Sequence, residues 1–281
     1  GSQAMRCCEQ MEDVRELSAV PGPAAPAAGK GEWPFLAVSA LLFVSSAGAT
    51  AYCGDSMSGG MEMPGGWTLS MAWMRMPGQS WPGAAALFLG MWLLMMAAMM
   101  LPALVPMLLA YHHTRRPVMG RWLTAGGYLG VWLAFGALAY LPGVLLAALA
   151  LDSGLFARCV PALTGIAVVF LGVLQMTEWK LGQLTRCRAV RPCATGASQG
   201  WGGRSAWAHG LQLGLCCLRC NANLMLVQLV AGVMDLKLMA LLTLAISAER
   251  LAPAPRMVAR AVGLAIVAAG AVMFTADLIA I

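Results

Sequence analysis

Long apolar segments separated by short polar connections are the feature that most constrains the fold of this 281-residue chain. A helix needs about 20 mostly apolar residues to cross a bilayer. Charged residues make up 11% of the sequence, well below the share of about 25% that is usual in soluble domains. Seven segments have the required length and composition, the sixth being the shortest: 34–53, 83–111, 122–150, 160–180, 207–231, 236–250 and 257–280.

These segments predict an all-α fold, a polytopic transmembrane helical bundle formed by residues 33–281. In lipid only helices and closed barrels satisfy the backbone hydrogen bonds, and the sequence has no alternating pattern of the kind that barrel strands carry. Residues 1–32 have a mixed-charge stretch followed by a run of Pro, Ala and Gly, so we expect a mobile cytosolic tail there.

The distribution of basic residues predicts the orientation. Most of the 18 Lys and Arg residues lie in the tail and in alternate connections, including the loop 181–206. Cytoplasmic loops of membrane proteins are enriched in these residues. We therefore predict a multi-pass protein of the bacterial inner (cytoplasmic) membrane, with the N-terminus inside, the C-terminus outside and the loop 54–82 outside. The net charge of +6 follows from this topology, so the expected partner is the lipid bilayer and not nucleic acid.

Methionines are concentrated in the outer loop 54–82 and in the apolar segment that follows it. Soft thioether and thiolate ligands select Cu(I) over hard cations, and methionine cannot oxidise to a disulfide outside the cytosol. The pattern predicts a Cu(I) path, although methionine is also a common filler of irregular cores and the loop could instead lie on the bilayer surface. The loop methionines are Met57, Met61, Met63, Met71, Met74 and Met76. The helix methionines are Met91, Met95 and Met99 on one stripe and Met96, Met100 and Met107 on another.

The fifth apolar segment carries a continuous polar face. On a helical wheel, an arc of about 80° contains His209, Gln212, Cys216, Cys220 and Asn223. Polar groups inside a span are costly and usually functional, whereas a lone buried cysteine behaves as a small hydrophobe. We interpret Cys216, Cys217 and Cys220 as candidate metal ligands with His209, and expect Cys216 and Cys220 to contribute most. The Cys217-x-x-Cys220 pair is an alternative redox site.

Further residues complete the predicted site. Arg219 lies in the middle of the same segment and needs a partner, for which Glu178 is preferred over Asp277. At the cytoplasmic side, two pairs of side chains could release copper, His112 with His113 and Cys187 with Cys193. The alternative is that the histidines are only solvated and that the cysteines bind no metal.

Three stretches of the chain resemble one known family. They are Met91-Trp92-x-x-Met95-Met96-x-Ala98-Met99-Met100-Leu101-Pro102, Gly127-Tyr128-x-x-x-Trp132 and His209-Gly210 with Gly214 and Cys217-Leu218-x-Cys220. Together they resemble the signature of an uncharacterised bacterial family described as predicted metal-binding integral membrane proteins, over about residues 57–270. The resemblance implies a metal-binding membrane protein. The chain departs from the family pattern at Arg219, where a glycine is usual.

The leading hypothesis is an integral membrane Cu(I)-binding protein that takes up or delivers copper through the loop and an intramembrane Cys/Met site. Its partner would be a copper chaperone or a membrane-bound copper enzyme. Two alternatives stay open: a thiol–disulfide carrier that uses Cys217 and Cys220, and an assembly subunit of a membrane-bound copper oxidase. The sequence contains none of the common nucleotide-binding or hydrolase motifs, which argues against most enzyme classes.

Overall fold

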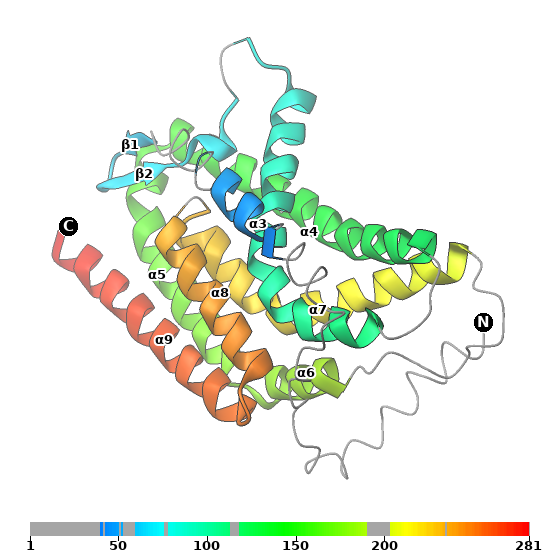
Figure 1. Ribbon diagram of the computed structural model, residues 1–281. Helices are drawn as coiled ribbons and strands as arrows, with labels where there is room; N and C mark the ends of the chain where they lie inside the picture. The colour runs from blue at the N-terminus through cyan, green and yellow to red at the C-terminus, as the bar shows by residue number, and fades with distance from the viewer. Residues whose placement is uncertain are drawn as a thin grey trace.

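The computed structural model describes residues 40–41, 43–50, 52, 60–75, 78–112, 118–189, 203–233 and 235–280. These residues form a bundle of helices with a small two-stranded sheet at one end (Figure 1). The predicted tail 1–32 lies outside the described residues, as do the whole of Met57 and Met76 and the side chain of Met107.

Seven helices of the bundle, α3 to α9, are labelled in Figure 1. They are α3 (Trp81–His112), α4 (Val118–Asp152), α5 (Gly154–Gln175), α6 (Glu178–Ala189), α7 (Gly203–Ala231), α8 (Leu236–Leu251) and α9 (Pro255–Ala280). Five of them contain stretches long and apolar enough to cross a membrane: α3, α4, α5, α7 and α9. This confirms a mostly helical protein with membrane-like helices. The predicted total of seven spans is not confirmed by the described residues: α8 has 16 residues, and part of 34–53 lies outside the described residues.

The prediction of one continuous segment over 160–180 is wrong. Helix α5 ends at Gln175, and a separate helix, α6, begins at Glu178. The hydroxyl of Thr177 accepts a 3.5 Å hydrogen bond from the backbone N–H of Lys180, the arrangement by which Thr caps a helix N-terminus. The new helix turns Lys180 into the protein, where it is fully buried.

Helices α4 and α7 approach closely because glycines line their contact. A side chain at Gly210 would place its Cβ 2.1 Å from the carbonyl oxygen of Thr124, and one at Gly127 would lie 2.5 Å from the carbonyl oxygen of Trp207. Small residues allow helix backbones to approach each other in this way. The contact brings α4 against the face of α7 that carries Cys217.

The sheet lies against the bundle. Strands β1 (Met61–Met63) and β2 (Trp67–Leu69) are antiparallel and joined by a turn in which Gly65 and Gly66 have positive φ, a conformation that favours glycine. The indole of Trp67 donates a 2.8 Å hydrogen bond to the carbonyl of Ala157 in α5. The described part of the loop 54–82 is therefore anchored on the helices.

Gly210→Ala should destabilise the bundle, since its new methyl group overlaps the α4 backbone and overpacking costs typically about 1–3 kcal/mol, occasionally more. Gly90→Ala in α3 is the matched control, because a Cβ there meets no atom within 4 Å. The thermal unfolding midpoint of the purified protein should fall clearly for the first variant and hardly change for the second. Equal midpoints would contradict the close α4–α7 contact.

Candidate metal centre

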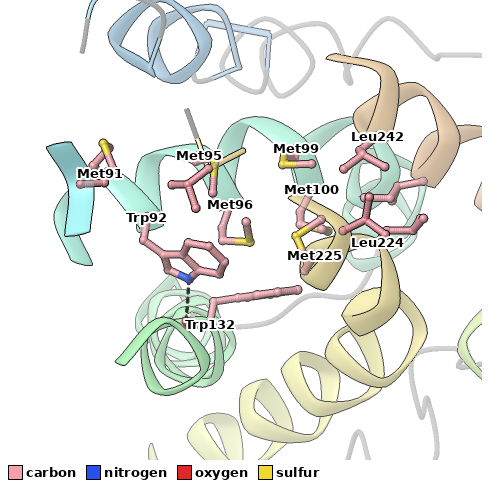
Figure 2. Packing of buried hydrophobic residues seen from close by; sticks show 14 of the residues in the cluster. Met91, Trp92, Met95, Met96, Met99, Met100, Trp132, Leu224, Met225 and Leu242 are labelled. Carbon is pink, nitrogen blue, oxygen red and sulfur yellow. Dashed lines mark hydrogen bonds between the residues drawn. The ribbon is translucent and has the colours of Figure 1, made fainter. Parts of the chain in front are cut away.

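A row of buried thioethers occupies the inner face of α3 (Figure 2). Met91, Met95, Met96, Met99 and Met100 each expose 7% or less of their surface. They belong to the main hydrophobic core, in which Trp92, Trp132, Leu224, Met225 and Leu242 also lie. The predicted stripes of α3 thus face the protein interior, where they fill the core and place successive sulfur atoms along one helix.

The indole of Trp92 fixes this row against α4. Its Nε1 donates a 3.0 Å hydrogen bond to the carbonyl oxygen of Trp132, drawn as the dashed line in Figure 2. Gly136 lies directly beside the ring, since a Cβ there would come within 2.5 Å of it. This contact fixes the position of α3 along α4, so the α3 methionines keep a fixed position relative to the neighbouring helices.

The loop 54–82 reaches the first methionine of this row. Met71 and Met74 line a small cavity of about 40 Å³ together with Met91. A second cavity, of about 10 Å³, is lined by Met91, Met95, Met239 and Asp235 among others. Met91 therefore lies between the loop and the interior of the bundle.

The remaining loop methionines have different surroundings. Met61 exposes 44% of its surface, whereas Met63 is buried in a separate apolar cluster with Leu69 and Ala157. The described part of the loop thus contains one exposed methionine, one packing methionine, and Met71 and Met74 beside α3.

Cys217 is the centre of a polar cluster inside the core. Its Sγ lies 3.8 Å from the Sδ of Met100, and it accepts hydrogen bonds from the Nη2 of Arg250 at 3.0 Å, the hydroxyl of Tyr128 at 3.3 Å and the Nδ2 of Asn221 at 3.3 Å. The amide of Asn221 also lies 3.8 Å from the Met100 sulfur. Four helices, α3, α4, α7 and α8, thus contribute to one site.

The other two cysteines of α7 differ from Cys217. Cys216 is half-buried and Cys217 is buried, and neither forms a disulfide. Cys220 is buried and disulfide-bonded, and its sulfur lies 3.2 Å from the carbonyl oxygen of Gln183. We expected Cys216 and Cys220 to share the site, but it is Cys217 that lies beside Met100. Cys217 and Cys220 are not bonded to each other.

The polar face of α7 is not a single surface in the structure. Asn223 is buried, His209 is half-buried and Gln212 is exposed. Within the part of the chain that the structure describes, the Asn223 amide nitrogen has no hydrogen-bond partner. These side chains point into different environments around the helix and do not converge on Cys217.

The predicted pairing of Arg219 with Glu178 is not observed. Glu178 instead forms a 3.1 Å ion pair with Arg260, and both side chains are largely exposed. The break after α5 explains the difference, because it moves Glu178 into the first turn of α6. Arg219 is exposed on α7. The side chains of Asp277, His112 and Cys187, and the whole of His113 and Cys193, lie outside the described residues.

A buried ion pair lies next to the Cys217 cluster. Lys180 Nζ is 3.0 Å from Glu249 Oε2, and it also donates to the carbonyl oxygen of Cys220. Gln175 donates to the other oxygen of Glu249. Burial lowers the pKa of Lys180, and the charge of Glu249 opposes this shift. The pair joins α5, α6, α7 and α8 immediately beside Arg250.

Sequence reasoning missed Tyr128, Asn221, Lys180, Glu249 and Arg250 as site residues. The spacing of Cys217 and Asn221, four residues apart, could have placed them on one helix face. From the sequence, Lys180 and Arg250 are interpreted as cytoplasmic charges, because each is the last residue of a predicted apolar segment. Their burial depends on tertiary contacts that no local pattern contains.

The ligand chemistry of the cluster is soft. Among the residues that the structure describes, no group of three His, Cys, Asp or Glu side chains is arranged to hold a metal ion. A site at Cys217 would instead use one thiol and one thioether, a combination that suits Cu(I). A helical bundle with apolar spans and a buried row of soft sulfur atoms defines a class of candidate metal-handling membrane proteins.

A family comparison agrees with this class. The family model described as PpoB2, copper chaperone, matches residues 89–273, so the chain belongs to this copper chaperone family. The match includes most of α3, all of α4 to α8, and Cys217, Asn221 and Arg250. No curated protein and no solved structure matches the chain.

Lys180→Met should strongly destabilise the protein, because removing one partner of a buried pair leaves the other charge uncompensated, typically at about 3–5 kcal/mol. Arg260→Met is the control, since it removes one partner of an exposed pair, and such pairs contribute little. Thermal unfolding of both purified variants tests this. A similar midpoint for both would mean that the Lys180–Glu249 pair is not buried as described.

Proposed function

We propose that this protein is a membrane-embedded Cu(I) chaperone of the bacterial inner membrane, with its N-terminus inside. It takes up Cu(I) at the outer loop and holds the ion at Cys217 and Met100 before transfer to a copper enzyme or a second chaperone. The observation that carries the proposal is the 3.8 Å distance between Cys217 Sγ and Met100 Sδ in the core. Metal–thiolate bonds are about 2.3 Å for zinc, so two sulfurs at this separation can share one ion with a near-tetrahedral angle.

The row of methionines on α3 supplies a path to this site. Each thioether is a neutral, soft ligand, so Cu(I) can pass from one to the next without deprotonation. Met71 and Met74 would receive the ion, and Met91 would take it into the bundle. Met95, Met96 and Met99 continue the row toward Met100.

Cys217 would act as the stronger ligand at the end of this path. A metal-binding cysteine acts as the thiolate. The side chains of Arg250, Asn221 and Tyr128 donate hydrogen bonds that orient the sulfur. The site then combines one charged and one neutral soft ligand.

The thiol–disulfide carrier is less well supported than the copper chaperone. A carrier of this kind needs Cys217 and Cys220 to exchange between dithiol and disulfide, yet Cys217 is free and Cys220 is disulfide-bonded. An assembly role toward a copper oxidase remains compatible with a chaperone, because it specifies the recipient of the same ion.

Cys217→Ser should remove about one bound Cu(I) per protein, because serine keeps the size of the side chain but provides no soft ligand. Met100→Leu should weaken the same site without abolishing it, since the thiolate remains. Cys216→Ser is the matched control, since Cys216 is the neighbouring cysteine, lies on another side of the helix and forms no disulfide. Copper content is measured after anaerobic loading and gel filtration. Equal losses in Cys216→Ser and Cys217→Ser would contradict a site centred on Cys217.

The double variant Met71→Leu/Met74→Leu should slow copper loading of membrane vesicles at low external Cu(I), because leucine keeps bulk but lacks sulfur. The stoichiometry at saturating copper should stay the same, since Cys217 and Met100 are intact. Met63→Leu is the control, because Met63 is buried and does not line the cavity that Met71 and Met74 share with Met91. Loading that is unchanged in the double variant would limit Met71 and Met74 to a packing role.

A further inference from the structure

Among the described residues, Arg250 forms no ion pair with a carboxylate. Its Nη2 lies 3.0 Å from Cys217 Sγ, and its Nε is buried with no hydrogen-bond partner in the described part of the chain. The adjacent acid, Glu249, forms its ion pair with Lys180. The guanidinium is instead in direct contact with the sulfur of Cys217.

The ligands of the Cys217 site do not by themselves distinguish Cu(I) from soft divalent cations. Thiolate binds Zn(II) as well as Cu(I), and the same sulfur would also accept Cd(II). The neutral neighbours, Asn221 and Tyr128, carry no charge that would favour one cation over another. The positive charge of Arg250 beside the Cys217 sulfur does distinguish monovalent from divalent cations, because it repels a divalent ion more strongly.

We propose that Arg250 is a specificity-determining residue that restricts the Cys217–Met100 site to a monovalent soft cation and excludes Zn(II) and Cd(II). The inference rests on the proposed function, since it concerns the selectivity of the same site. It assigns to Arg250 a role that is separate from binding copper, because a guanidinium has no lone pair to donate to a metal.

The electrostatics support this role. The repulsion between Arg250 and a bound ion is proportional to the charge of the ion, and a partly buried environment screens it less than water does. Once the Cys217 thiolate balances the guanidinium, Cu(I) adds one net charge to the interior, whereas Zn(II) adds two. The desolvation penalty of an uncompensated buried charge is large, so the second charge is strongly disfavoured.

The experiment compares Arg250→Gln with Arg250→Lys in the full-length protein in lipid nanodiscs. Cu(I) affinity is measured anaerobically against a colorimetric Cu(I) chelator, and Zn(II) and Cd(II) by metal analysis. Cd(II)–thiolate absorption in the ultraviolet reports binding at the cysteine, with Arg250→Gln/Cys217→Ser as its control. We expect Arg250→Gln to bind Cd(II) and Zn(II) at least tenfold more tightly than the wild type, with a smaller change for Cu(I). Arg250→Lys should remain selective.

The outcomes separate this inference from the proposed function. If the wild type binds Cu(I) through Cys217 but Arg250→Gln keeps the same ratio of Cu(I) to Cd(II) affinity, the role of Arg250 is wrong and the chaperone proposal stands. If Cys217→Ser leaves Cu(I) binding intact, the proposed site itself is wrong. If Arg250→Gln does not fold, Asn221→Asp neutralises the same charge by an isosteric change 3.3 Å from the sulfur. Unchanged Cd(II) affinity in that variant overturns the inference.

Discussion

The buried pair of Lys180 and Glu249 is the interaction on which the candidate site depends. Neither charge could be kept in the interior alone, because the desolvation of a single ion exceeds what packing returns. Together with Gln175 and the carbonyl of Cys220, they connect the end of α5, the start of α6 and the last turn of α8 to the middle of α7. Because Arg250 follows Glu249 directly on α8, the position of the pair also determines where the guanidinium meets Cys217.

The core methionines have two physical roles that need not compete. A thioether side chain is apolar and flexible, so it fills irregular space between helices. The same sulfur atoms are soft ligands. A row such as Met95, Met96 and Met99 can therefore pack tightly when empty and adjust by side-chain rotation when an ion is present. A core of leucine would have similar volume without any ligand, which is why Met-to-Leu changes separate the two roles.

The helical architecture was predictable because it depends on the length and composition of apolar segments, which are local properties. The break between α5 and α6 was not predicted, because its capping residue, Thr177, lies in a short polar stretch, 175–180, that was assigned from the sequence to the end of an apolar segment. The choice among cysteines also failed to follow from a helical wheel. A helical wheel shows which residues of α7 share a face, but it does not show which face α3 contacts. That contact is made by the face that carries Cys217 and not by the polar face that carries Cys216.

Arg250 shows the same limit for charged residues. The distribution of Lys and Arg predicts topology because each charge is assumed to face water, so a basic residue at the end of a span is read as part of a loop. In the fold, α8 is short, and its last turn stays within the bundle beside Cys217. Arg250, which the topology rule assigns to a cytoplasmic loop, is thus in contact with the sulfur of Cys217. The family match includes this residue together with Met100 and Cys217 but begins after the two-stranded sheet. The copper site proposed here therefore belongs to the part of the chain shared with the family, whereas the loop methionines proposed as its entrance precede that part.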